Sequence, residues 1–203
     1  AGQAAVDACI RDLRLDDNTA LLAALGQSIR VVPVFIFDER QQNHSFFGEN
    51  SFAFLLQSLI DLDARLRTFG SRLFCFQGLP HRIVPPLARA LSADAVFVNR
   101  DYTPFSKERD LSIAEACRKE QIDFNSFADI LLNEPEEVHK TDGGPYSVFT
   151  PFLNRSRLFP VREPMENRQT NYFSTIDFQN VSLPMVAQQA ELPMSGRTLS
   201  ARK

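Results

Sequence analysis

Apolar runs alternate with amphipathic stretches along most of the chain. A first apolar run at residues 5–10 is followed by an amphipathic stretch at 19–26. A second run, at 29–37, is almost continuous in β-branched and aromatic side chains. Such a run is typical of a strand that is covered on both faces of a sheet. The pattern therefore predicts a strand, a helix and a central buried strand, in this order.

The alternation continues over the next ninety residues. Apolar positions from Phe52 to Phe69 follow helical spacing, and Gly70 stands where that helix would end. Further strands are predicted at 72–77, 94–99 and 123–127, and further helices at 83–91, begun or interrupted by Pro85 and Pro86, and at about 105–121. Five strands alternating with four helices predict an α/β fold, a doubly wound, mostly parallel five-stranded sheet.

The regular pattern is lost beyond about residue 160. Prolines are scattered there among Gln, Asn, Arg and Ser, without sustained periodicity. This composition is typical of a linker or a poorly packed tail. We expect one domain at residues 1–160 and an irregular C-terminal tail at 161–203.

Composition narrows the function classes. With 203 residues, 44% of them apolar, the chain can build one sizeable core, and its net charge of −3 argues against binding nucleic acid unaided. Cys9, Cys75 and Cys117 lie within apolar patterns, which suits buried free thiols in a reducing compartment, and their spacing fits no zinc site. No apolar run approaches the roughly 18 residues of a membrane span. The cytoplasm is the expected location.

Charge is concentrated at two places that follow predicted strands. The stretch RDLRLDDN at 11–18 holds five charged side chains, and an Asn-Arg-Asp triplet begins at Asn99. One of the last three residues of the first stretch can cap the following helix. Its two arginines and first aspartate are expected to pair within the loop, or to contact a bound ligand or another domain. Ligands of doubly wound sheets bind at this carboxyl edge, near the point where strand order reverses.

Three motifs together resemble the amino-terminal half of DNA photolyases and cryptochromes. They are RDLRLDDN at 11–18, NRDYTPFSKERD at 99–110 and KTDGGPYSVFTPF at 140–152. The resemblance spans about residues 5–160 and is nearest to bacterial enzymes that repair cyclobutane pyrimidine dimers. It implies a domain that binds an antenna chromophore and passes excitation energy to FAD in a larger helical domain, which would be missing here. Without that domain, a tryptophan relay or a basic groove, we expect the chain alone to have no catalytic residues and no repair activity.

The resemblance also implies where the antenna chromophore would bind. The site would lie at the strand ends, near Ile10, Arg11, Phe35, Asn99 and Asp101. Asp101 falls where family members that use a deazaflavin place an acidic residue against the chromophore. Taken alone, the same residue can be a turn-forming aspartate.

Other positions in the motifs indicate which chromophore is expected. Phe105 and Ser106 stand where folate-using members carry an Asn-Glu pair, so a deazaflavin or a flavin is favoured over methenyl-folate. Residues 8–10 stand where the family usually carries an aromatic and cationic run. The resemblance is therefore weaker evidence for any one antenna chromophore. Residues 107–110 can form a solvated helix face, whereas the family match implies that Arg109 and Asp110 form a structural pair.

Two other function classes remain open. One is a cryptochrome-like signalling module whose α/β domain is a protein-binding surface. The other is a stand-alone nucleotide-binding domain, against which the absence of a Gly-rich phosphate loop counts. The histidines are scattered, with no triad and no metal-site spacing. The expected partners are the FAD-binding domain and, only through that domain, DNA; a homodimer through the exposed interdomain surface is an open alternative.

Overall fold

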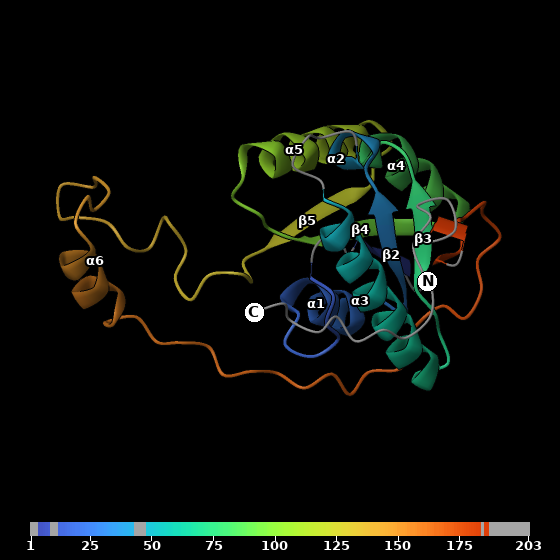
Figure 1. The fold of residues 1–203 in the computed structure, drawn as a ribbon, viewed down its shortest axis with the longest axis horizontal. Coiled ribbons are helices and arrows are strands. Elements are labelled where there is room, and N and C mark those ends of the chain that lie inside the picture. Colours follow the sequence, from blue (N-terminus) through green and yellow to red (C-terminus); the bar gives the residue numbers. More distant parts are fainter. Residues whose placement is uncertain (1–3, 9–11, 43–47, 184, 187–203) are drawn as a thin grey trace.

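A five-stranded parallel sheet with helices on both faces forms the body of the protein (Figure 1). The computed structural model describes residues 4–8, 12–42, 48–183 and 185–186. The strands are β1 (Ala4–Ala8), β2 (Arg30–Phe37), β3 (Phe74–Gln77), β4 (Ala93–Asn99) and β5 (Asp123–Phe127). The helices are α1 (Thr19–Gln27), α2 (Glu39–Gln42), α3 (Glu49–Thr68), α4 (Pro80–Ala90), α5 (Pro104–Lys119) and α6 (Phe149–Ser156). All four strand pairings are parallel, in the order β3-β2-β1-β4-β5, so the predicted fold class is confirmed.

Strand β2 shows why its sequence is almost continuously apolar. Successive side chains of a strand point to opposite faces. Val31, Phe35 and Phe37 pack with α1 and α3, whereas Val32, Val34 and Ile36 pack with α4 and α5. All these side chains are buried, because both faces of the sheet are covered.

Helix α4 differs from its prediction. It begins at Pro80, three residues before the expected start, and continues through Pro85 and Pro86. Proline suits the first turn, but in a helix interior it removes a backbone hydrogen bond. The buried stripe formed by Val84, Leu87 and Ala88 holds the helix against the sheet and offsets the missing bonds.

The chain beyond residue 160 also packs differently from the prediction. It is irregular, as expected, but its described part lies against the sheet. The Val31 N–H donates to the Asn171 carbonyl at 2.9 Å, and the Phe173 N–H donates to the Val31 carbonyl at 2.9 Å. Tyr172, Leu183 and Val186 are buried. The sequence did not predict these contacts because single side chains, without periodicity, make them; the linker interpretation and the domain boundary near residue 160 stay predictions.

The two described cysteines agree with the sequence analysis. Cys75 and Cys117 are free and buried, and Cys9 lies outside the described residues. Within the described ranges, no helix has the length and apolar character needed to cross a membrane.

Candidate functional site

The carboxyl edge between β1 and β4 is where the order of strands reverses. Strand β1 pairs with β2 on one side and with β4 on the other, so this point is the topological switch of the sheet. The charged loop 12–18 and the residues after β4 both lie at this edge. Two residues predicted to bind the chromophore, Ile10 and Arg11, lie outside the described residues.

Asn18 provides the helix cap that the sequence predicted. Its side-chain oxygen accepts a hydrogen bond from the Leu21 N–H at 3.1 Å, and its amide donates to the Arg14 carbonyl at 3.1 Å. Asn18 is completely buried. The capping prediction is therefore confirmed for Asn18, and the two aspartates before it are left for other partners.

Asp16 and Asp17 bind the chain segment that returns after residue 160. Asp17 Oδ1 accepts from the Arg162 guanidinium at 2.6 Å and from the Met165 N–H at 3.2 Å. Asp16 Oδ1 accepts from the Asn167 N–H at 3.0 Å, which, with an ion pair to Arg65, lowers the pKa of this carboxyl. Sequence reasoning could not find these partners, because a backbone N–H some 150 positions away carries no residue-specific signal.

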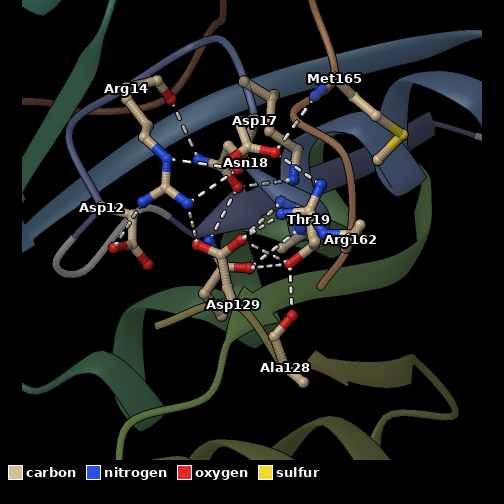
Figure 2. Close-up of polar contacts among 12 residues, drawn as sticks. Asp12, Arg14, Asp17, Asn18, Thr19, Ala128, Asp129, Arg162 and Met165 are labelled. Atoms are coloured by element: carbon tan, nitrogen blue, oxygen red, sulfur yellow. Dashed lines mark hydrogen bonds and ion pairs between the residues drawn. The ribbon is translucent and has the colours of Figure 1, made fainter. Parts of the chain in front are cut away.

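Asp129, two residues after β5, is the centre of a partly exposed ionic cluster that was not predicted from the sequence (Figure 2). Its side chain is 0% exposed. It accepts from Arg14 Nη2 at 2.6 Å and from the Thr19 N–H at 3.1 Å, and Arg162 lies 3.8 Å away. The ion pair expected within the loop exists, since Arg14 also contacts Asp12 at 3.3 Å. The feature of the sequence that could have pointed to Asp129 is its position two residues after a predicted strand.

Asn99 joins the end of β4 to the start of α1. Its oxygen accepts from the Ala20 N–H at 2.9 Å, and its amide donates to the Asn18 oxygen at 2.8 Å. The Thr19 hydroxyl lies 3.0 Å from the same Asn99 oxygen. The side chain thus fixes the geometry of the switch point by contacts within the protein.

Asp101 is buried, with 6% of its surface exposed, at the start of α5. One carboxylate oxygen accepts from the Thr103 N–H at 3.2 Å, and the other accepts from the Ser106 hydroxyl at 2.8 Å. The contact to Thr103 makes Asp101 a turn-forming residue. Whether Asp101 also contacts a ligand stays a prediction.

Arg109 and Asp110 form the structural pair that the family match implied. Their side chains are 3% and 13% exposed and lie 2.8 Å apart. The solvated-face interpretation is therefore wrong for Arg109. Burial raises the pKa of Asp110, Arg109 opposes this shift, and the negative charge of Asp101 adds to it. The start of α5 is thus a buried, strongly charged region.

A second ionic group connects the end of β2 with α5. Asp38 is buried directly after β2 and binds the Arg40 guanidinium at 2.7 and 3.0 Å. The guanidinium carbon lies 4.8 Å from the centre of the Phe105 ring, within range of a cation–π contact. Arg40 is partly exposed, so the edge near α5 presents a cation and an aromatic ring. The sequence analysis named neither Asp38 nor Arg40.

Phe35 is separated from the other predicted site residues. It is 4% exposed and packs edge-on against Phe37, at 4.9 Å between ring centres, on the face covered by α1 and α3. Helix α5, which follows Asp101, packs on the opposite face. The structure therefore groups Asn99 and Asp101 at the edge and assigns the Phe35 side chain to the core.

Within the described ranges, no group of three His, Cys, Asp or Glu side chains could hold a metal ion.

The sheet and its charged switch point define a doubly wound α/β domain with a polar carboxyl edge. The family model for DNA photolyase matches residues 9–167. The chain belongs to the DNA photolyase family.

Known relatives include both photolyases and cryptochromes. The chain is 35% identical over 155 residues to the deoxyribodipyrimidine photo-lyase of Synechococcus sp., covering 76% of this chain and 32% of the relative. It is 40% identical over 153 residues to cryptochrome-1 of Drosophila melanogaster, covering 72% and 28%. The chain thus spans about a third of the length of these relatives.

The fold is similar to that of solved photolyases. An archaeal photolyase from Sulfolobus tokodaii, described with two FAD molecules and a novel light-harvesting cofactor, superposes with a TM-score of 0.82 at 34% identity. The match covers 92% of this chain and 41% of that one.

Proposed function

We propose that this chain is the antenna-binding part of a photolyase and that it binds a flavin or deazaflavin at the carboxyl edge near α5. The observations that carry the proposal are the buried contact between Asp101 and Ser106 and the Arg109–Asp110 ion pair near the start of α5, together with the contact between Arg40 and Phe105. Fixed charges beyond the strand ends are where doubly wound sheets bind ligands. The two FAD molecules of the similar Sulfolobus tokodaii photolyase support a flavin as the ligand.

The donors and acceptors at this edge suit the polar rim of a flavin-type ring. The carboxylate of Asp101 would accept from a ring N–H, and the Arg40 guanidinium would donate to a ring carbonyl. The Phe105 ring offers an aromatic face for stacking. The chromophore, when bound, would supply light absorption, and the protein would supply orientation. Methenyl-folate fits less well, because Phe105 and Ser106 replace the expected amide and carboxylate.

The proposed partner is the FAD-binding helical domain of a photolyase, which would receive the excitation energy and repair pyrimidine dimers. Large apolar side chains are exposed on and around α6, at Val148, Phe149, Leu158 and Val161. An apolar surface of this kind is typical of a protein contact. DNA would be contacted only through that domain, and the isolated chain would show no repair activity. Without its partner, the same surface could form a homodimer.

The test is a fluorescence and absorption titration with FAD, FMN, a deazaflavin and methenyl-folate in turn. We expect saturable binding of a flavin-type ligand, weakened at least about tenfold in Asp101→Ala, which corresponds to about 1.4 kcal/mol. Asp94→Ala is the matched control, because Asp94 is exposed and lies at the opposite end of β4. Unchanged affinity in Asp101→Ala would remove this residue from the site. Binding of none of the four ligands would overturn the proposal.

A cryptochrome-like signalling role is the second candidate, favoured by the 40% identity to cryptochrome-1 of Drosophila melanogaster. In that case the α/β domain would bind a protein partner independently of any antenna. A pull-down with and without flavin separates the two roles, since a signalling surface should retain its partner equally in both conditions.

A further inference from the structure

Residues 130–161 form an arm that leaves the sheet after β5 and returns to the same edge. Figure 1 shows its helix α6 well away from the sheet, and no residue of α6 is buried. Asp129 precedes the arm and Arg162 follows it. Arg162 Nη2 lies 3.8 Å from Asp129 Oδ1, so the two ends of the arm meet at a neck.

The neck contains the carboxylates of Asp17 and Asp129 and the guanidinium groups of Arg14 and Arg162, and each contact joins a carboxylate to a guanidinium. Arg14 and Arg162 both face the buried Asp129, and Arg162 also binds Asp17 at 2.6 Å. Thr19, the first residue of α1, donates its backbone N–H to Asp129 at 3.1 Å. The neck is thereby fixed to the start of a buried helix. Figure 2 shows these side chains converging from the loop before α1, the end of β5 and the returning segment.

The outgoing and returning sides of the arm are held unequally. On the outgoing side, Glu134 binds Arg100 at 3.1 Å and also accepts a hydrogen bond from the Tyr102 hydroxyl, so this side has an anchor besides Asp129. On the returning side, the described backbone hydrogen bonds of residues 157–159 go back to α6, and Arg162 is the first residue after them with a described contact to the domain. Arg162 is therefore the attachment nearest to the arm on this side, followed by the hydrogen bonds of Met165 to Asp17 and of Asn167 to Asp16.

We propose that the neck is a latch that fixes the direction in which the arm leaves the domain, with Arg162 as its positioning residue. A guanidinium holds its donors in a rigid planar fork, which fixes its direction when it binds Asp17 and faces Asp129 at once, whereas the donors of an ammonium group rotate freely. Without Arg162, Asp129 keeps Arg14 and the Thr19 N–H, so the domain stays folded. The returning segment loses its first attachment, and the arm then samples a wider range of directions.

The test is a pair of spin labels on the full chain, one at Asn154→Cys in α6 and one at Glu115→Cys in α5, both exposed positions. Cys9 is replaced by Ala, and the buried Cys75 and Cys117 remain unlabelled. Arg162→Gln should widen the distance distribution about twofold while the urea midpoint stays nearly unchanged. Arg162→Lys keeps the positive charge but lacks the planar guanidinium. Its distance distribution should be narrower than that of Arg162→Gln and wider than that of the unaltered protein.

Arg168→Gln is the matched control, because Arg168 lies in the same segment and its described ion pair is with Glu166, two residues before it. It should leave the distribution unchanged. A distribution in Arg162→Gln as narrow as in the unaltered protein would overturn the latch, as would equal widening in Arg168→Gln. Neither result depends on chromophore binding, so the latch and the proposed antenna function can fail separately.

Discussion

Replacing Tyr172 tests whether the segment after residue 160 belongs to the folded core. The residue is 8% exposed, and its ring lies 5.9 Å from that of Phe69. Its hydroxyl accepts a hydrogen bond from the buried Asn167 amide at 2.7 Å. Its backbone neighbours pair with Val31 at the start of β2. Tyr172→Ala removes the ring and the hydroxyl together, and Tyr172→Phe removes the hydroxyl alone.

The expected magnitudes follow from these contacts. Truncating a buried aromatic ring to alanine typically costs about 3–5 kcal/mol. In a domain of this size, that corresponds to a fall in Tm of roughly 6–20 °C. Tyr172→Phe should cost about 1–3 kcal/mol, because it leaves the Asn167 amide buried without its acceptor.

Urea unfolding followed by far-UV circular dichroism measures both effects. The matched control is Phe149→Ala, since Phe149 is 70% exposed on α6 and should change the free energy of unfolding by no more than about 0.5 kcal/mol. If Tyr172→Ala proves as mild as this control, the segment contributes nothing to the core and the reasoning is refuted.

Two further predictions concern titratable groups. The Asn167 N–H and a nearby guanidinium lower the pKa of Asp16 below its ordinary value of 3.8, so this carboxylate stabilises the fold above that value and loses the effect as the pH falls through the lowered pKa. The stability difference between the protein and Asp16→Asn should be constant above about pH 5 and disappear as the pH falls through the lowered pKa; a difference that grows on acidification would contradict this. Burial raises the pKa of Cys75 to about 12 and of Cys117 to about 11. In a Cys9→Ala background, neither thiol should react with a disulfide reagent at about pH 8 until urea is added, and rapid reaction of the folded protein would contradict their burial.

The sheet could be predicted because each strand carries its own local signal. A run such as 29–37 is apolar on both faces, which few structures other than a covered strand allow. Helix α3 was predictable from its apolar stripe, and Asn18 was predictable as a cap from its position before α1. These features depend on neighbours within a few residues, and a sequence displays such neighbours directly.

The ionic clusters depend on contacts that a sequence does not display. Asp17 and Arg162 are 145 positions apart, and nothing in their local patterns connects them. Asp129 was overlooked because it follows a short, half-exposed strand and resembles an ordinary loop residue. Phe35 was predicted near the chromophore site, and the structure shows its side chain on the face opposite α5; its part in the site stays a prediction. Whether Asn99 and Asp101 contact a chromophore stays a prediction.

Strand β3 lies at the margin of the sheet, and the returning chain covers it. The Val181 N–H donates to the Cys75 carbonyl at 2.8 Å, in an antiparallel bridge on the outer side of β3. A bare strand at this position would offer its unpaired backbone to other molecules and promote aggregation. A polypeptide shortened to residue 160 would keep all five strands, but the backbone groups on the outer side of β3 would be exposed. We therefore expect a stretch that contributes no strand of its own to the sheet to protect this strand from aggregation.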